Sequence, residues 1–226
     1  MTAIVAKTQS AVESRARQSD GISDAAIYRM VASALKRRQF RGELIIDVGC
    51  GTGSLFPFVR ERFQRYVGVD AVRYEGFPDD AEFHKVDLDT GRAPFPEECA
   101  DAVVAVEIIE HLENPRAFMR ELARLTKPGG CVVVTTPNQL SLLSLLTLIV
   151  KKRFAAFQDV HYPAHLTALL DVDLRRIAAE CGLTDIEISY SGQGRIALTP
   201  WHYPRFVSAL FRRALSDNLL LMGRRV

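Results

Sequence analysis

The chain has 226 residues, of which 48% are hydrophobic, and its 29 lysines and arginines stand against 27 aspartates and glutamates. We expect residues 1–226 to form a single domain, since this length suffices for one sizeable core. The near-neutral charge argues against a general nucleic-acid binder. Four scattered cysteines and a polar N-terminus without an apolar signal core predict a cytoplasmic protein with free thiols.

The first forty residues begin polar and become helical. Apolar side chains recur at helical spacing between Ile22 and Leu35, which predicts an amphipathic helix. We expect residues 1–40 to form a helical cap beside the ligand site.

A strand-type run from Leu44 to Val48 breaks into Gly49, Gly51 and Gly53, and a helical pattern begins at Ser54. Glycine permits positive φ and lets a ligand lie against bare backbone. The free N–H groups of a following helix favour an anionic group. This arrangement predicts a nucleotide cradle. A dinucleotide fingerprint would need a further glycine where Ser54 stands.

Two acidic residues refine the choice of nucleotide. Asp47 precedes the glycines and suits a ligand that carries an ammonium group. Asp70 follows a second predicted strand, 66–69, where a carboxylate accepts both ribose hydroxyls; this residue alone fits NAD equally well. Together with the serine at position 54, these residues favour S-adenosylmethionine.

Strands and helices then alternate along the chain. Strands are predicted at 82–86, 101–106, 131–136, 184–190 and 218–225, and helices near 54–63, 114–126 and 171–181. Such alternation predicts an α/β fold with a doubly wound, mostly parallel sheet. Residues 41–138 form the expected cofactor-binding core. The regular pattern lapses in 139–170 and 191–213, which we expect to be an inserted lid and substrate segments.

The order of these motifs resembles the class I S-adenosylmethionine-dependent methyltransferases, and in particular the ubiquinone-biosynthesis O-methyltransferase-like group. The resemblance rests on Asp47–Gly53, Gly68–Asp70, Val86–Leu88, Asp101–Glu107 and Leu125–Gly130. It implies a Rossmann-like, three-layer αβα fold with seven strands, the last of them antiparallel.

The resemblance also implies a set of cofactor contacts. Asp47 and the glycines would hold the methionine end, Asp70 the ribose and Asp87 the adenine amino group, while Leu88 would pack on the adenine face. The implied cofactor-binding residues are Asp47, Gly49, Cys50, Gly51, Gly53, Asp70, Ala71, Asp87, Leu88 and Glu107.

The sequence Glu107-Ile108-Ile109-Glu110-His111 follows the predicted fourth strand. A helical turn would gather the two carboxylates and the imidazole, which suit Mg²⁺ or Mn²⁺ with His165 as a further ligand. The pattern resembles the ubiquinone-biosynthesis enzymes and the small-RNA 3′-terminal 2′-O-methyltransferases, and in the latter such residues hold a metal. Alternatively, His111 and Glu110 are the catalytic pair, with His111 as general base, or they only cap the turn.

An oxygen nucleophile fits the motifs best. The fourth predicted strand ends in neither an Asp/Asn-Pro-Pro-aromatic box nor a Pro-Cys pair, so methylation of a nucleobase is not expected. We predict O-methylation of a hydroxyl on a small metabolite, a saccharide, or a lipid- or quinone-type intermediate. The alternatives are a metal-dependent RNA 3′-terminal ribose 2′-O-methyltransferase and a non-catalytic subunit that binds S-adenosylmethionine.

The segment Leu140 to Val150 is strongly apolar, and Lys151, Lys152 and Arg153 follow it. Eleven residues are too few to span a bilayer. The segment is either a buried lid helix or an interfacial helix, and the second interpretation predicts a peripheral membrane contact through 140–153. A second aromatic cluster, Trp201 to Pro204, either stacks on a ligand or packs internally.

Overall fold

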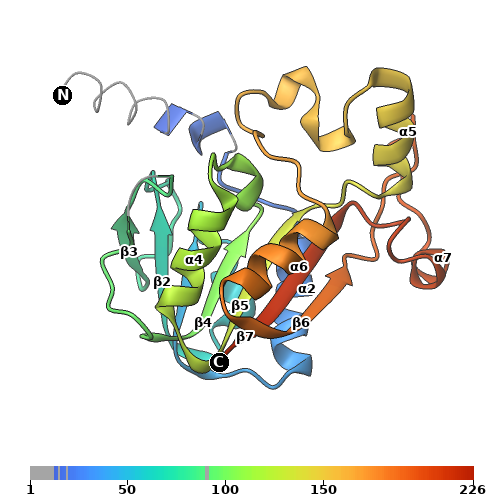
Figure 1. The fold of residues 1–226 in the computed structure, drawn as a ribbon. Helices are drawn as coiled ribbons and strands as arrows, with labels where there is room; N and C mark the ends of the chain where they lie inside the picture. The colour runs from blue at the N-terminus through green and yellow to red at the C-terminus, as the bar shows by residue number, and fades with distance from the viewer. Residues whose placement is uncertain (1–12, 15, 19, 90–91) are drawn as a thin grey trace.

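The computed structural model describes residues 13–14, 16–18, 20–89 and 92–226, so part of the predicted cap lies outside the described residues. At its centre is a seven-stranded sheet in the order β3-β2-β1-β4-β5-β7-β6 (Figure 1). The strands are β1 Gly42–Val48, β2 Phe63–Asp70, β3 Glu82–Lys85, β4 Ala100–Val106, β5 Thr126–Pro137, β6 Leu183–Tyr190 and β7 Asn218–Arg225.

Strand direction confirms the predicted sheet. The pairs among β1 to β5 are parallel, whereas β7 runs antiparallel to both β5 and β6. The last strand therefore lies one place in from the edge formed by β6. The fold is the Rossmann-like arrangement that the sequence predicts.

Helices surround the sheet as α2 Ala25–Arg37, α3 Phe56–Val59, α4 Pro115–Leu125, α5 Leu142–Lys151, α6 Asp171–Glu180 and α7 Arg205–Leu210, with 3₁₀ turns η1 Ile109–His111, η2 Ala155–Phe157 and η3 Asp159–His161. Asn114 begins α4 by accepting the backbone N–H of Ala117, and Pro115 takes the first helical position. The predicted helix at 54–63 is much shorter than expected, because β2 already begins at Phe63, paired with Gly42.

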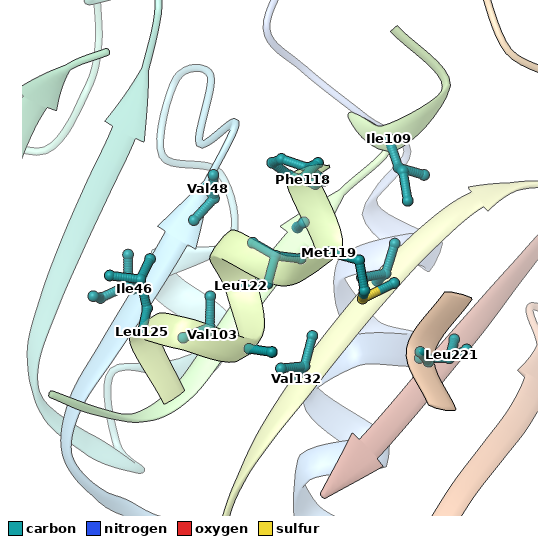
Figure 2. Packing of buried hydrophobic residues seen from close by; sticks show 14 of the residues in the cluster. Ile46, Val48, Val103, Ile109, Phe118, Met119, Leu122, Leu125, Val132 and Leu221 are labelled. Atoms are coloured by element: carbon teal, nitrogen blue, oxygen red, sulfur yellow. The ribbon is translucent and has the colours of Figure 1, made fainter. Parts of the chain in front are cut away.

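Both faces of the sheet are buried. Along β1, β4 and β5, Ile46, Val103 and Val132 face α4 and α6 (Figure 2), while the side chains next to them face α2. Successive strand residues point to opposite faces, so a strand covered on both sides is apolar throughout. This explains the continuous apolar runs in the sequence.

The helix α5 belongs to a lid that stands above the sheet (Figure 1). Its one fully buried residue is Ser144, which accepts a hydrogen bond from the backbone N–H of Ala155. Most of its apolar side chains are exposed instead, and Ile149 and Val150 are 67% and 77% exposed. The interpretation as a buried lid helix is therefore wrong. Within the described ranges, no helix is long and apolar enough to cross a membrane.

Candidate active site

A cavity of about 660 Å³ opens at the edge of the sheet where β1, β2, β4 and β5 end and β7 begins. These strand ends contribute Asp47, Asp70, Val106, Pro137 and Asn218 to its wall. Ligands of open α/β sheets bind at the carboxyl ends of parallel strands, and the volume is typical of a small-molecule site.

The glycine loop after β1 forms one wall of this cavity. Gly51 has φ of +52°, and a Cβ there would lie 2.0 Å from the carbonyl oxygen of Gly21. The backbone N–H of Thr52 donates to that same oxygen at 3.0 Å, and the N–H of Gly51 donates to the Asp70 carboxylate at 2.8 Å. The loop is thus held between the end of β2 and the segment that precedes α2, and only glycine fits at position 51.

Asp47 ends β1 with one carboxylate oxygen paired and the other unpaired. The Tyr66 hydroxyl donates to its Oδ2 at 2.5 Å, whereas Oδ1 is buried without a hydrogen-bond partner. Burial raises the pKa of Asp47 to about 7. A buried carboxylate oxygen that faces a cavity without a partner is costly, and the ammonium group of a ligand would compensate it.

The structure places most, but not all, of the predicted cofactor residues at the cavity. Residues that line it include Asp47, Gly49, Cys50, Gly51, Asp70, Ala71, Leu88 and Glu107. Gly53 and Asp87 do not line it. A Cβ at Gly53 would meet Pro78 at 2.5 Å, so this glycine makes room for the chain behind the loop. From the segment after β3, Leu88 and Asp89 face the cavity.

Glu107 lies in the left-handed backbone region, with φ of 51°. Its Oε2 accepts a hydrogen bond of 2.7 Å from the Asn218 side chain, and its backbone N–H donates to the Thr135 hydroxyl at 3.0 Å. Its Oε1 is buried and without a partner, and burial raises the pKa of this carboxyl to about 7. Glu107 therefore presents a second oxygen suited to a cationic ligand.

Glu110, His111 and His165 form a compact group whose potential ligand atoms all lie within 4.8 Å of one another. The Thr136 hydroxyl donates to Glu110 Oε2 at 3.0 Å, and Glu110 Oε1 is buried without a partner. Burial, together with the nearby Glu107 carboxylate, raises the pKa of Glu110 well above its usual range.

The two histidines of this group are oriented by backbone carbonyls. Nδ1 of His111 lies 2.9 Å from the Ala164 oxygen, and Nδ1 of His165 lies 2.6 Å from the Ala156 oxygen. A carbonyl oxygen only accepts, so each Nδ1 carries the hydrogen, and Nε2 of each neutral ring keeps its lone pair. Nε2 is thus the ring nitrogen suited to accept a proton or to bind a metal, and such carbonyl contacts are typical of metal-binding histidines.

The predicted helical turn through positions 107, 110 and 111 is wrong. The 3₁₀ turn η1 begins only at Ile109, and the left-handed conformation of Glu107 directs the backbone away from it. Three of the four predicted metal ligands come together, while Glu107 lies outside their group.

Sequence reasoning missed several residues that hold the charged groups. Tyr66 pairs with Asp47, Asn218 with Glu107, and Thr136 with Glu110. From the segment before and within α2, Ser23 and Tyr28 line the cavity. No local motif marks these residues, because each is brought to its partner by the register of distant strands or by packing of α2.

Comparison with known proteins identifies the family of the chain. A family model described as a methyltransferase domain matches residues 22–188. A "Probable S-adenosylmethionine-dependent methyltransferase" of Mycolicibacterium smegmatis is 26% identical over 182 residues, which cover 78% of this chain and 66% of the relative. A "Ubiquinone biosynthesis O-methyltransferase" of Rhodopseudomonas palustris is 37% identical over 125 residues, covering 52% and 49%.

Solved structures share the fold. A SAM-dependent methyltransferase from Archaeoglobus fulgidus superposes with a TM-score of 0.61 at 18% identity, over 88% of this chain and 94% of that one. The chain belongs to the methyltransferase-domain family, within the class I S-adenosylmethionine-dependent methyltransferases. It spans about half to two thirds of the length of the curated relatives named above.

Proposed function

We propose that the chain transfers a methyl group from S-adenosylmethionine to a hydroxyl oxygen of a small acceptor. The observation that carries the proposal is the presence in one cavity of two unpartnered buried carboxylate oxygens, on Asp47 and Glu107, and of the oriented Nε2 of His111. The carboxylates suit a cationic cofactor, and the imidazole suits an acceptor that loses a proton.

The cofactor carries two positive charges, an ammonium and a sulfonium, in its methionine part. Asp47 is the penultimate residue of β1 and Glu107 directly follows β4. These two strands pair, and both residues line the cavity. A bound cation favours the ionised form of each carboxyl, which the empty cavity disfavours. Asp70, the last residue of β2, would bind the ribose hydroxyls.

In the proposed reaction, the acceptor oxygen attacks the methyl carbon of the sulfonium, the carbon–sulfur bond breaks, and S-adenosylhomocysteine leaves as a neutral thioether. The acceptor hydroxyl loses its proton to Nε2 of His111. The Ala164 carbonyl holds the ring in the tautomer that accepts this proton, and it favours the imidazolium that forms. The remaining contribution of the protein is to position the two reactants.

A specific observation favours a second form of this site, in which a divalent metal would help to deprotonate the acceptor hydroxyl. Glu110, His111 and His165 each offer one potential ligand atom, a carboxylate oxygen and two imidazole nitrogens, and this donor set fits Mn²⁺ or a similar ion. Such an ion lowers the pKa of a bound hydroxyl. It favours acceptors with two neighbouring oxygens, such as a catechol or the terminal ribose of an RNA.

Electron paramagnetic resonance of Mn²⁺, with S-adenosylhomocysteine present, separates the two forms. Saturable micromolar binding that is lost in His165→Ala, but kept in the control His84→Ala, a half-buried histidine on β3, would establish the metal site. Absence of binding would leave His111 as the base for a single hydroxyl.

The methyl transfer itself is tested by following release of S-adenosylhomocysteine with a panel of catechols, saccharides and prenyl alcohols. Turnover on a hydroxylated compound that stops when its hydroxyl is blocked supports the proposal. Turnover only on amines would contradict it.

The exposed apolar side of α5, with Lys151, Lys152 and Arg153 at and beyond its end, supports a peripheral contact with a membrane. Apolar side chains followed by basic ones are typical of interfacial helices. The lid would then bring the acceptor side of the cavity close to the bilayer, where lipid- or quinone-type acceptors reside.

A further inference from the structure

We propose that a groove beside the cofactor cavity binds a phosphate group of the methyl acceptor. This inference rests on the proposed function, because it requires the acceptor to enter the same cavity. It names the chemical class of the acceptor as a hydroxyl compound that carries a phosphate.

The groove has a volume of about 660 Å³ and runs between α2 and α7, over the turn after β6. One side is formed by a face of α2 that includes Ala26, Arg29 and Ser33, and the other by Arg205 and Arg212. The two hollows share wall residues, namely Ala26, Ser191, Gln193 and His202. An extended acceptor can therefore reach from the groove into the cofactor cavity.

The charge of the groove is unbalanced. Arg29, Arg37, Arg205 and Arg212 line it, and none of the described residues in its wall is acidic. Arg37 pairs with Glu187 at 3.0 Å. In the part of the chain that the structure describes, the other three form no ion pair, whereas some exposed arginines elsewhere, such as Arg65 and Arg116, pair with Glu82 and Glu180.

Unpaired guanidinium groups around one groove repel one another, and an anion between them would remove that repulsion. Guanidinium groups bind phosphate through two parallel hydrogen bonds, which makes arginine the preferred residue for this ligand. A phosphate monoester carries a charge between about −1.5 and −2 near neutral pH. Such a dianion matches three cations better than a single carboxylate does.

A phosphate held here would contribute to catalysis from a distance. His111 lines the cavity but not the adjoining groove, so the anchored phosphate would fix the far end of the acceptor while its hydroxyl approaches His111. Binding energy from a remote group is used in this way to position the reacting atoms.

The chain contains one tryptophan, Trp201, which is 72% exposed and adjacent in sequence to the groove residue His202. Its fluorescence can follow a titration with sn-glycerol 3-phosphate in the presence of S-adenosylhomocysteine. A parallel arm uses co-sedimentation with phosphatidylcholine vesicles that do or do not contain phosphatidic acid. The two arms distinguish a free phosphate compound from a lipid headgroup.

The variant Arg29→Gln/Arg205→Gln removes one cation from each side of the groove, and Arg120→Gln, an exposed arginine on α4, is the matched control. We expect saturable binding of at least one probe, weakened at least tenfold in the double variant and unchanged in the control. Equal binding in all three proteins, or binding of neither probe by the wild type, would overturn the proposal.

The affinity for S-adenosylmethionine is measured in the same proteins. If phosphate does not bind while cofactor binding and methyl transfer persist, the groove assignment fails and the proposed function stands. If the double variant loses its cofactor affinity or its thermal stability, Arg212→Gln alone repeats the test with a smaller perturbation of α2.

Discussion

The cofactor-binding core and the two segments proposed to bind the acceptor differ in how they use charge. On the cofactor side, the charged groups are few, acidic and buried, and Asp47, Glu107 and Glu110 each keep one oxygen without a partner. On the proposed acceptor side, most of the charged groups are basic, and these basic groups are exposed. Segments 139–170 and 191–217 carry seven lysines and arginines against two aspartates, while the remainder carries 22 against 25 acidic residues.

This difference indicates how each ligand is selected. A buried carboxylate distinguishes a cation strongly, because the low dielectric around it amplifies the interaction. Exposed arginines and lysines are screened by salt and tolerate ligands of varied shape. The cofactor side is therefore suited to one ligand, and the acceptor side is where members of this fold can differ.

The largest expected effect is that of His111→Gln, which removes the base of the proposed reaction. We expect kcat on an acceptor found in the hydroxyl panel to fall about 10²- to 10⁴-fold, with the affinity for S-adenosylmethionine changed less than about threefold. Steady-state kinetics and calorimetry check the two quantities. A fall in kcat of less than about tenfold would assign His111 a structural role.

The variant Asp47→Asn tests whether a buried carboxylate selects the cofactor. Removing one charge of a buried pair costs about 2–4 kcal/mol, which corresponds to a weakening of about 30- to 1,000-fold in the Kd for S-adenosylmethionine. Asp185→Asn is the control, because Asp185 is exposed and its positive φ is one that asparagine tolerates. An unchanged Kd in Asp47→Asn would remove this residue from the cofactor site.

The pH dependence of stability tests the buried carboxyls without an acceptor. The pKa values of Asp47 and Glu107 are raised to about 7 in the fold, above their values in an unfolded chain. The stability that their protonated forms provide is thus present below about pH 4 and is lost as the pH rises through 7.

For the ligand-free protein, we expect Tm to fall between pH 5 and pH 8, by about 2–4 °C for each kcal/mol lost. S-adenosylmethionine favours the ionised carboxyls, so the Tm increase it causes should be larger at pH 8 than at pH 6. Differential scanning calorimetry measures both trends. An Asp47→Asn protein should show a smaller fall with pH, and an equal slope would contradict the assignment.

The smallest effect on the fold is expected for Ile149→Glu/Val150→Glu on the acceptor side. Both side chains are exposed, so the free energy of unfolding should change by less than about 0.5 kcal/mol for each. Flotation with anionic vesicles should nevertheless be lost. Val172→Glu, at an exposed apolar position of α6, is the control. Equal flotation of all variants, or none by the wild type, would exclude membrane contact through α5.

The sheet could be predicted from the sequence because its strands are buried on both faces and therefore read as apolar runs, such as Val103 to Val106. The cradle was visible because Gly49 and Gly51 have a backbone geometry that other residues rarely adopt. A sequence pattern does not, however, show what each of its residues contacts. Gly53 fits the same sequence pattern, but it makes room for Pro78 instead of lining the cavity.

Two features were hidden for physical reasons. The partners Tyr66 and Asn218 lie 19 and 111 residues from Asp47 and Glu107, and only strand register brings them together. The orientation of α5 could not be predicted, because apolar composition normally indicates burial and therefore favours the interpretation as a buried lid helix. Its fully buried residue, Ser144, is polar, so composition alone could not identify which side of the helix faces the protein.

The position of β7 between β5 and β6 has a consequence for synthesis on the ribosome. Until residues 218–225 emerge, β6 has no neighbouring strand with which to pair, since it contacts the sheet only through β7. The same strand begins with Asn218, which holds Glu107. A nascent chain can therefore form its glycine loop early but cannot complete its cofactor pocket until this late strand is inserted, so cofactor binding reports that the sheet is finished.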